Sequence, residues 1–439
     1  MMREALSLLE KRVLVLGLGD TGVSVARWVE REGGKVRAAD TRAAPPGKDR
    51  YRGELHTGPF TPGLLEDVDL VCISPGLSLS EPIVREAVQR KIPVVGDVEL
   101  FAWQNTAPVL AVTGTNGKTT VTALTGHLLR TAGVDCEVAG NIAPPVLQAL
   151  EKRKNPPAAW VLELSSYQLE TTSSLAPAAA AMLNLSEDHL DRYSSLDHYG
   201  AAKARILKGA RVQILNRDDP RSMAMAQAGG KVVTFGLDTP RGDDFGLAGD
   251  MLMRGRDEIV ALDELAIRGA HNVANALAAA ALASTLGISP EGLRTGLKSF
   301  KGLPHRLQLV AARRGVEWYD DSKGTNVGAT VAALRGLGKK AVLILGGEGK
   351  GQDFAPLREP VARFATRVLL IGRDAPLIAK ALSGLPTEFC SSLEDAVQKA
   401  SQLPAEAVLL SPACASFDMF RDYRHRGEAF AAAVKALAP

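Results

Sequence analysis

Cysteine is scarce in this chain, which has four cysteines among 439 residues. They are scattered along the sequence, and no two of them stand in a C-x-x-C spacing. Disulfide-built domains and zinc sites need several closely spaced cysteines, so we exclude both as organising features. Free thiols are typical of a reducing compartment, and we therefore expect a cytoplasmic protein. The four are Cys72, Cys136, Cys390 and Cys414.

Long apolar runs and a strong excess of one charge are also missing. No apolar run approaches the roughly 20 residues of a membrane span. The segment at residues 1–10 is too short and too charged to predict a signal peptide. The 52 basic and 49 acidic side chains nearly balance, at a formal net charge of +3. This pattern predicts no membrane partner and no nucleic-acid partner.

What the chain does have is length and an ordinary globular composition, with 46% hydrophobic and 23% charged residues. A chain of this length is too long for one hydrophobic core and suggests roughly three domains. Strand-like and helix-like segments alternate along it, and no internal repeat is visible. Alternating βα units predict an α/β fold with parallel sheets, whose ligands bind at the carboxyl ends of the strands.

The strongest motif is VLAVTGTNGKTT at residues 109–120. Its apolar start predicts a buried strand, its two glycines a tight loop, and Lys118 the start of a helix. These parts form the phosphate cradle of a P-loop, in which backbone N–H groups and the lysine hold phosphates and Thr119 meets Mg²⁺. Val112 stands where the general pattern has its first glycine, so the loop is a variant. The alternative is an ordinary glycine-rich turn before a helix.

A second glycine motif, G-x-G-x-x-G, occupies residues 17–22. It follows a predicted strand and precedes a predicted helix, and the next predicted strand ends at Asp40. This is the fingerprint of a dinucleotide-binding fold, in which the acidic residue holds a ribose hydroxyl or a base edge. Taken alone it suggests NAD, although any nucleotide diphosphate could use the same turn. The alternative for Asp40 is a cap or turn residue.

The central segment offers several side chains for the same site. Glu163 ends an apolar predicted strand beside the P-loop, where a ligand of Mg²⁺ belongs. His189 lies among acidic residues and either binds a metal or caps a helix. Lys203, judged from the residues alone, is expected to be a solvated lysine of a helix. Asn272 and Asn275 share a helix face and suit an adenine edge, and the alternative is helix capping by Asn272.

From about residue 303 onward, four predicted strands alternate with helices and indicate a second Rossmann-like unit without the three-glycine fingerprint. Polar clusters follow these strands and favour a pocket for a substrate carboxylate. The basic run RDYRHR at 421–426 is predicted to be a solvated or inter-domain face rather than a nucleic-acid patch. The predicted strands are 317–321, 341–345, 368–371 and 407–411.

The order of these motifs carries a specific resemblance that covers the whole chain. The chain resembles the Mur ligases, the ATP-dependent amino-acid-adding enzymes of peptidoglycan synthesis. The start GLGDTG, the triplet DTR at 40–42 and SPACASFD at 411–418 are most similar to the members that add D-glutamate to UDP-N-acetylmuramoyl-L-alanine. The motifs in order are GTNGKTT (114–120), LELSSYQLE (162–170), NLSEDHLDRY (184–193), GAHNVANA (269–276), LPHR (303–306) and DSKGTN (321–326).

The resemblance implies an α/β fold of three domains. These are an N-terminal Rossmann-like UDP-binding domain at 1–96, a central ATP-binding P-loop domain at 97–302 and a C-terminal Rossmann-like amino-acid-binding domain at 303–439. It also implies ATP, two Mg²⁺ sites, two small-molecule substrates and a monomer. In the implied reaction, the substrate carboxylate takes the γ-phosphate of ATP and becomes an acyl phosphate, which the amine of D-glutamate then attacks.

The resemblance further implies a role for each of a set of residues. Catalysis falls to Lys118, Glu163, His189 and Lys203, with Lys203 carbamylated. ATP is held by Gly114, Thr115, Asn116, Gly117, Lys118, Thr119, Thr120, Asn272, Asn275, Arg306 and Asp321. The UDP-sugar is held by Gly19, Thr21, Asp40, Thr41, Ser74, Gly76, Asn141 and His189. D-glutamate is held by Lys323, Thr325, Lys350, Ser416, Phe417 and Tyr423. The metal ligands are Thr119, Glu163, His189 and Lys203.

Three other classes of protein share parts of this pattern. A folylpolyglutamate-type ligase has a similar central fold, but the fingerprinted N-terminal segment and the late position of the P-loop speak against it. A nicotinamide-dependent dehydrogenase would explain the first glycine motif and leave the P-loop without a role. A regulatory GTPase would need an Asp-x-x-Gly switch beside the P-loop strand pair and a base-reading Asn-Lys-x-Asp, which the sequence lacks.

Overall fold

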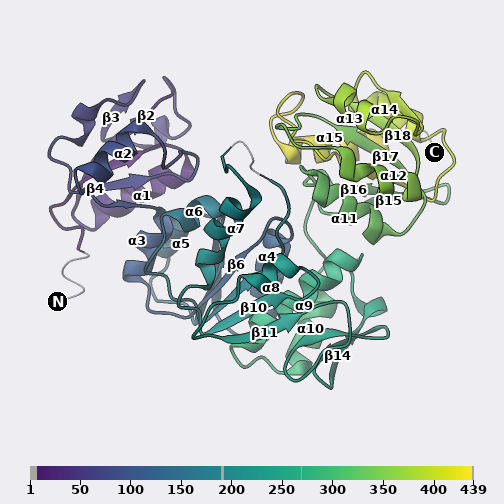
Figure 1. Cartoon of the computed structure of the whole chain (residues 1–439), viewed down its shortest axis with the longest axis horizontal. Helices are drawn as coiled ribbons and strands as arrows, with labels where there is room; N and C mark the ends of the chain where they lie inside the picture. The colour runs from purple at the N-terminus through teal and green to yellow at the C-terminus, as the bar shows by residue number, and fades with distance from the viewer. Residues whose placement is uncertain (1–6, 189–191, 268, 438–439) are drawn as a thin grey trace.

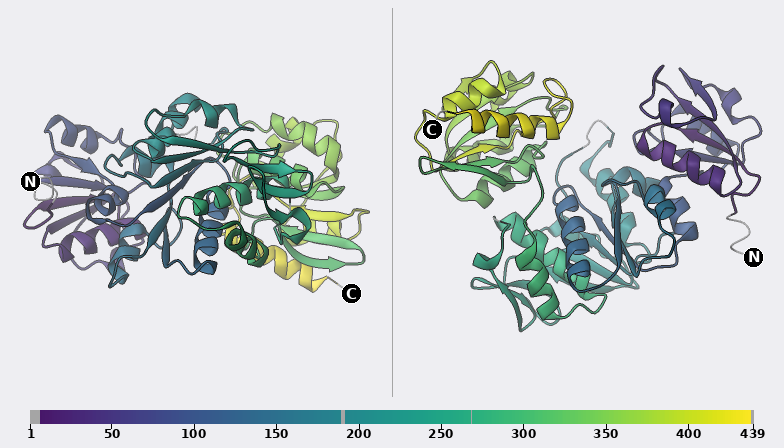
Figure 2. Two further views of the ribbon diagram at one scale, coloured as in Figure 1. Left: turned by 90° about the horizontal axis from the view of Figure 1, so that it is seen from below. Right: turned by 180° about the vertical axis from the view of Figure 1, so that it is seen from behind.

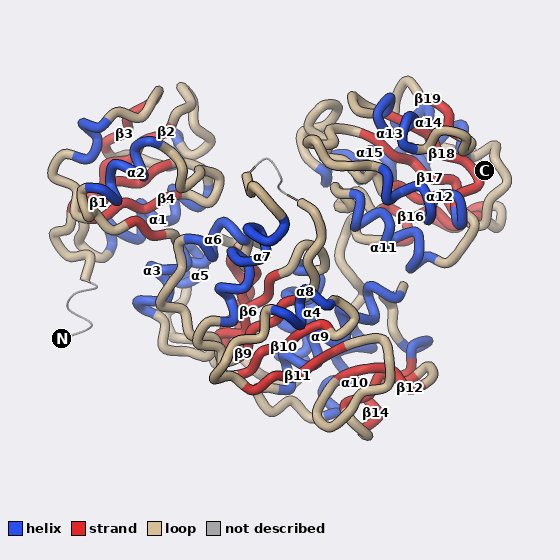
Figure 3. Tube along the Cα trace, in the orientation of Figure 1, coloured by secondary structure: helices blue, strands red, loops and turns tan. Residues whose placement is uncertain are grey.

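The computed structural model describes residues 7–188, 192–267 and 269–437. Three β-sheets follow one another along the chain, each with helices packed on it, so the predicted α/β class is confirmed (Figure 1). The N-terminal and C-terminal units lie at opposite ends of the central unit in all three ribbon views (Figure 2). The alternation of helix and strand along the trace is plain when the chain is coloured by secondary structure (Figure 3).

The first unit is a five-stranded parallel sheet in the order β3-β2-β1-β4-β5. Gly17 and Gly22 shape the turn that follows its central strand. Gly17 has φ +84°, and a Cβ on Gly22 would lie 1.9 Å from the carbonyl oxygen of Gly17, so the following helix can approach the turn only with glycine there. The elements are β1 (Arg12–Leu16), α1 (Asp20–Arg31), β2 (Lys35–Asp40), β3 (Glu54–Thr57), β4 (Leu70–Ile73), α2 (Pro82–Gln89) and β5 (Val94–Val95).

The central unit is a nine-stranded sheet in the order β14-β13-β12-β11-β10-β9-β6-β8-β7. Its strands run parallel from β7 to β12, and an antiparallel extension, β12 to β14, completes one edge. The strands are β6 (Val109–Thr113), β7 (Cys136–Gly140), β8 (Ala159–Glu163), β9 (Ala179–Met182), β10 (Val212–Asn216), β11 (Lys231–Phe235), β12 (Phe245–Ala248), β13 (Met251–Arg254) and β14 (Asp257–Ala261).

The helices of the central unit cover both faces of this sheet. The P-loop helix α4 and the long helix α9 pack together on one face, and the apolar residues on both helices belong to one hydrophobic cluster. The helices are α3 (Asp97–Gln104), α4 (Lys118–Thr131), α5 (Val146–Lys152), α6 (Ser166–Glu170), α7 (Leu196–Ala204), α8 (Pro220–Ala224), α9 (Ala270–Ser284) and α10 (Pro290–Ser299).

The third unit is a six-stranded sheet in the order β15-β16-β20-β17-β18-β19, in which only the edge strand β15 is antiparallel among the described strands. The four predicted strands are present, while β15 and β19 were not predicted. The elements are β15 (Gln308–Arg313), β16 (Val316–Asp320), α11 (Val327–Leu337), β17 (Ala341–Gly346), α12 (Arg358–Phe364), β18 (Ala365–Ile371), α13 (Ala375–Ala381), β19 (Thr387–Phe389), α14 (Leu393–Ala400), β20 (Ala407–Leu410) and α15 (Tyr423–Ala436).

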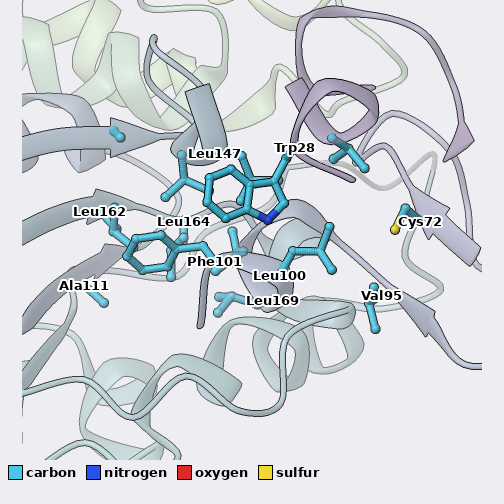
Figure 4. Close-up of a cluster of buried hydrophobic side chains, with 14 of the residues drawn as sticks. Trp28, Cys72, Val95, Leu100, Phe101, Ala111, Leu147, Leu162, Leu164 and Leu169 are labelled. Carbon is cyan, nitrogen blue, oxygen red and sulfur yellow. The ribbon is translucent and has the colours of Figure 1, made fainter. Parts of the chain in front are cut away.

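One hydrophobic cluster runs from the first unit into the central unit. Trp28 of α1 lies near Leu147 of α5 and Phe101 of α3 (Figure 4), and all three are buried. Phe101 also meets the ring of Trp160 edge-on at a centroid distance of 5.0 Å. The third unit has two hydrophobic clusters of its own. The first two units therefore share a core, and the third does not join it.

No helix in the described part of the chain combines the length and the apolar character needed to cross a bilayer. The domain boundaries predicted at 96/97 and 302/303 fall between the three sheets, before α3 and before β15. They stay a prediction.

Candidate functional site

The P-loop lies at the carboxyl end of β6, as predicted. The loop needs glycine at two positions, since Gly114 has φ +152° and Gly117, the residue before α4, has φ +86°. Asn184 clamps the loop from the end of the neighbouring strand β9. Its side-chain oxygen accepts from the backbone N–H of Asn116 (2.8 Å), and its amide nitrogen donates to the carbonyl of Asn116 (3.1 Å). The cradle is therefore fixed by a side chain that the sequence alone did not single out.

Two lysines converge on this loop. The Nζ of Lys118 donates to the carbonyl oxygens of Gly114 (2.9 Å) and Thr115 (2.7 Å), and the Nζ of Lys203 donates to the same Gly114 oxygen (2.8 Å). The side chain of Lys203 also lies against the ring of Tyr199, 4.6 Å from its centroid. Burial lowers the pKa of both lysines, and that of Lys203 falls furthest because the nearby charge of Lys118 adds to it.

The expectation that Lys203 is a solvated helix lysine is wrong. Lys203 is 1% exposed and lies inside the central unit. Its helix α7 packs against α6, and its hydrogen bond to Gly114 is a tertiary contact between residues 89 positions apart. The placement that the family resemblance implied, inside the site, agrees with this burial.

Glu163 ends β8 directly beside the P-loop strand, in register with Val112 of β6. The residue is 3% exposed, so it is not a surface glutamate. One carboxylate oxygen, Oε1, accepts from the side-chain amide of Asn141 (2.7 Å). The other, Oε2, is buried and has no hydrogen-bond partner among the residues that the structure describes. A buried carboxylate oxygen without a partner fits a hard cation such as Mg²⁺, which takes oxygen ligands.

A cavity of about 320 Å³ joins the P-loop to the third unit. Thr119 and Glu163 line it from the central unit, and these hydroxyl and carboxylate oxygens suit Mg²⁺. Among the described residues no group of three or more histidine, cysteine and acidic side chains could hold a metal. His189, the remaining predicted ligand, lies outside the described residues. The lining residues are Thr115, Asn116, Gly117, Lys118, Thr119, Asn141, Glu163, Glu187, Asp188, Arg306, Lys323, Thr325, Asn326, Gly349, Lys350 and Gln352.

A second cavity of about 390 Å³ adjoins the first, sharing Asn116, Gly117, Arg306 and Lys323. Asn272 and Asn275 both line it, and the Asn275 amide donates to the Asn272 side-chain oxygen (3.3 Å). The alternative that Asn272 caps the helix is wrong, because the N-cap of α9 is Gly269. The further predicted nucleotide residues on this wall are Asn116, Gly117, Thr120, Arg306 and Asp321.

Asp321 lies on the wall of the second cavity, on the third-unit side. Its carboxylate accepts from the Ser411 hydroxyl (2.7 Å) and from the backbone N–H of Leu307 (3.1 Å). Burial raises the pKa of Asp321 to about 7, against the lowering effect of these hydrogen bonds and of Arg306. Burial also lowers the pKa of the Arg306 guanidinium.

The third unit contributes cations to the shared wall of the two cavities. The Nζ of Lys323 lies 4.1 Å from the ring centroid of Tyr423, and burial, with the charge of Arg306, lowers its pKa to about 8. Thr325 and Lys350 line the first cavity, and the Lys350 ammonium lies 6.0 Å from the ring centroid of Phe417.

Three predicted D-glutamate residues stand apart from the lining of both cavities: Ser416, Phe417 and Tyr423. Ser416 is 2% exposed, whereas Phe417 is 64% exposed.

The expectation that the basic run 421–426 is a solvated or inter-domain face is wrong for Arg426. That guanidinium is buried within the third unit and donates to the carbonyls of Ser322 (2.8 Å) and Cys414 (3.0 Å).

The predicted UDP-sugar residues of the first unit gather at the carboxyl edge of its sheet. Asp40 is buried, and its carboxylate accepts from the backbone of Leu18 (2.7 Å) and from the backbone and guanidinium of Arg42. The hydrogen bond from Arg42 holds the pKa of Asp40 down at about 2. These contacts are those of a turn residue, which was the alternative for Asp40, and its contact with the nucleotide stays a prediction. Gly19, Thr41, Ser74 and Gly76 lie in the loops beside it, and Thr21 lies in the first turn of α1.

Arg192 connects the first unit to the central one, and sequence reasoning did not single it out. Its guanidinium donates to the carbonyl of Pro75 (3.2 Å), between Ser74 and Gly76, and pairs with Glu170 (2.9 Å). It also stacks over Tyr167, 4.1 Å from the ring centroid. The side chains of this ion pair are mostly buried, so it fixes the loop at residues 74–76 against the central unit.

Three family models match the chain, and together they span most of it. They are "Mur ligase MurD-like, N-terminal domain" at residues 11–96, "Mur ligase middle domain" at 112–283 and "Mur ligase, glutamate ligase domain" at 305–414. Among solved structures, the chain is similar to MurC from Thermotoga maritima (TM-score 0.61, 20% identity, 97% of this chain and 99% of that one). It is also similar to MurF from Acinetobacter baumannii (TM-score 0.62, 19% identity, 97% and 93%).

The fold has three units, and residues of the third unit line the P-loop site. Together with the matches to the family models, this shows that the chain belongs to the Mur ligase family. Within the family, full-length relatives narrow the likeness. The chain is 54% identical to a protein of Thiobacillus denitrificans, over 99% of this chain and 98% of that one, and 54% identical to a protein of Nitrosospira multiformis, over 97% and 96%. Both relatives are named UDP-N-acetylmuramoylalanine–D-glutamate ligase.

Proposed function

We propose that the chain is an ATP-dependent ligase that joins D-glutamate to UDP-N-acetylmuramoyl-L-alanine in peptidoglycan precursor synthesis. The observation that carries this proposal is the cavity that brings the P-loop, Glu163 and the cations of the third unit to one place. Phosphate-binding groups and carboxylate-binding groups thereby face the same space. The relatives at 54% identity carry the name of this activity.

The nucleotide fits the two adjoining cavities. We propose that the P-loop backbone and Lys118 hold the ATP phosphates in the first cavity, while Asn272 and Asn275 face the adenine in the second. Arg306 and Asp321 then meet the ribose and phosphates from the third-unit side. To bind a phosphate, the Nζ of Lys118 would give up its hydrogen bonds to the carbonyl oxygens of Gly114 and Thr115. This is a small movement of the side chain.

Thr119 and Glu163 would hold Mg²⁺, with His189 and Lys203 serving a second site. When bound, the metal screens the negative charge of the phosphates and of the attacking carboxylate. Lys203 suits carbamylation, because burial lowers the pKa of its amine and so favours the uncharged form that can add CO₂. The carbamate would turn a cation into an anionic oxygen ligand. Asn141, which donates to Glu163, positions that carboxylate.

The reaction follows from bringing two anions together. The carboxylate of the L-alanyl substrate attacks the γ-phosphorus of ATP, the bond to the ADP oxygen breaks, and an acyl phosphate forms. The amine of D-glutamate then attacks the acyl carbon, a proton leaves the nitrogen, and phosphate departs as the amide forms. Lys118 and Lys350 supply positive charge on opposite walls of the cavity. Walls from two units exclude the water that would hydrolyse the acyl phosphate.

D-glutamate carries two carboxylates, and the third unit presents two lysines to the first cavity, Lys323 and Lys350. We propose that these lysines and Thr325 bind the amino acid, with Ser416, Phe417 and Tyr423 shaping the pocket after closure of the third unit. The UDP moiety is assigned to the first unit, near Thr41, Ser74 and Gly76. We further propose a cytoplasmic monomer whose partners are these small molecules.

The test is phosphate release from ATP and Mg²⁺ with UDP-N-acetylmuramoyl-L-alanine and a panel of amino acids. We expect release that depends on both the UDP-sugar and D-glutamate. Release with a different amino acid would keep the ligase activity and overturn the pocket assigned to the third unit. Absence of release with every pair would overturn the proposed function.

A further inference from the structure

Asn326, the residue before α11, forms a hydrogen bond between the third unit and the P-loop. Its side-chain oxygen accepts from the backbone N–H of Ala329 (2.8 Å) and caps the helix. Its side-chain nitrogen donates to the Oδ1 of Asn116 (3.2 Å) and to the Oδ2 of Asp188 (3.3 Å). The residue is 8% exposed. One amide therefore serves its own helix with its oxygen and the central unit with its nitrogen.

The central-unit end of this contact is rigid. Asn116 belongs to the P-loop, and its backbone is held on both its N–H and its carbonyl by Asn184. With the main chain fixed in this way, the Asn116 side chain projects toward the third unit. A displacement of Asn326 is consequently a displacement of α11 relative to the phosphate cradle itself.

Gly328 brings the first turn of α11 close to the same surface. A Cβ on this residue would lie 3.3 Å from both the Asn116 amide nitrogen and the Ser186 hydroxyl, closer than most side chains tolerate. The Ser186 hydroxyl is itself buried and finds no hydrogen-bond partner within residues 7–188, 192–267 and 269–437. The helix start thus fits closely against the P-loop and the segment that leads to Asp188.

The third-unit end of the contact leads to the amino-acid loops. The backbone N–H of Val327 donates to the side-chain oxygen of Gln352 (2.9 Å). The amide nitrogen of Gln352 donates in turn to the carbonyls of Gly349 (3.0 Å) and Ala413 (2.8 Å). Gly349 precedes Lys350, and Ala413 lies three residues before Ser416. The start of α11 is therefore tied to both loops that we assign to D-glutamate.

We propose that Asn326 is a positioning residue that sets the D-glutamate loops in register with the P-loop, so that the amine meets the acyl phosphate before water does. This inference rests on the proposed function. In the proposed reaction, Asn326 binds neither the phosphates nor D-glutamate. It acts through its contacts with Asn116 on one side and with α11 on the other. Its loss should spare the first chemical step and harm the transfer to the amine.

The variant Asn326→Asp separates the two duties of the side chain. Aspartate caps a helix as well as asparagine does, but it has no N–H to give to Asn116, and its charge opposes Asp188. We expect an unchanged melting temperature, a KM for ATP within about twofold of wild type, and a kcat for amide formation about ten- to a hundredfold lower. The ratio of ADP to amide product should rise above one, because unclaimed acyl phosphate hydrolyses.

Asn326→Ser is the matched control for capping, since serine caps the helix but is too short to span the same distance. It should uncouple ADP from amide formation in the same direction. The double variant Asn326→Asp with Asp188→Asn restores a donor–acceptor pair across the interface. Compared with Asp188→Asn alone, it should regain part of the coupling.

Amide formed at the wild-type rate, one for each ADP, in both Asn326→Asp and Asn326→Ser would overturn the proposal. An equal fall in ADP and amide, with the ratio kept at one, would also overturn it, because that result assigns Asn326 to the phosphoryl step or to general stability. If the wild-type protein formed neither ADP nor amide, the proposed function would fail instead, and the two failures are distinguishable.

Discussion

Lys118 and Lys203 donate to one and the same oxygen, the carbonyl of Gly114. Two ammonium groups that share an acceptor repel each other, and burial already disfavours the charge on both. The pKa of Lys203 is the more strongly lowered of the two. We therefore propose that Lys118 is the cation for phosphate, while the stronger lowering of its pKa favours the uncharged form of Lys203.

These different roles predict that Lys203 tolerates neither loss of its amine nor replacement by a permanent cation. We expect Lys203→Ala to lose at least about a hundredfold in rate, and added bicarbonate not to restore it, because the amine that would carry the carbamate is gone. Lys203→Arg keeps a cation and should be equally poor. Phosphate release measures both variants. Lys208→Ala, which alters an exposed lysine nearby, is the control, and full activity of Lys203→Ala would contradict the carbamate role.

The Oε2 oxygen of Glu163 has no hydrogen-bond partner among the described residues, and we predict that substitution of Glu163 weakens Mg²⁺ binding. Glu163→Gln removes the negative charge but keeps the shape, so the Mg²⁺ concentration for half-maximal rate should rise by about ten- to a hundredfold. Asn141→Ala, which deletes the donor to the other oxygen, should cause a smaller rise. Direct titration of Mg²⁺ in the presence of a non-hydrolysable ATP analogue provides a second readout. An unchanged Mg²⁺ requirement in Glu163→Gln, with the exposed Glu151→Gln as control, would remove Glu163 from the metal site.

The pKa of Lys323 predicts how D-glutamate use depends on pH. The lysine binds a carboxylate only when protonated, and its pKa in the free protein is about 8. Below that pH the ammonium is present, and as pH rises through 8 it is lost, so kcat/KM for D-glutamate should fall. In Lys323→Arg the guanidinium stays charged, and this fall should disappear. The ratio of the two profiles between pH 6.5 and 9.5 isolates the effect from the titration of the substrate amine. A ratio that does not change with pH would contradict it.

The core shared by the first two units predicts how the chain unfolds. Trp28→Ala should destabilise by about 3–5 kcal/mol and lower the temperature of one calorimetric transition, in which the first and central units unfold together. The third-unit transition should stay in place. Trp318→Ala is the matched variant, since Trp318 packs against Phe430 inside the third unit and should shift only the other transition. Separate melting of the first unit would argue against a cooperative shared core.

The parts of the fold and site that depend on short-range sequence patterns could be predicted from the sequence. The P-loop strand, its two glycines and the helix at Lys118 follow from short-range turn rules, and Glu163 follows because parallel strands end at a common edge. The antiparallel strands β12 to β14 were not predicted, although Gly249 and Gly255, both with positive φ, mark their turns. The edge strands β3 and β19 have only four and three residues, and their periodicity is too brief to identify them.

Long-range contacts account for what the sequence did not reveal. Lys203 lies on a helix without an apolar stripe, and its burial depends on Gly114, which is 89 residues away. Asn326 meets Asn116 across 210 residues, and Arg192 meets Pro75 across 117. No local propensity encodes such meetings. The family resemblance implied a position for Lys203 near the P-loop, and its contact with Gly114 agrees with that position, while its proposed role stays a prediction.

The continuous apolar cluster around Trp28, Leu147 and Phe101 also bears on how such a protein can change over generations. A genetic exchange at residues 302/303 would separate units whose main hydrophobic clusters are distinct and which meet in contacts such as those of Asn326. An exchange at 96/97 would cut through a common core and demand matching replacements on both sides. We therefore expect that residues 303–439 can be exchanged with little effect on the other cores, whereas the first and central units have to change together.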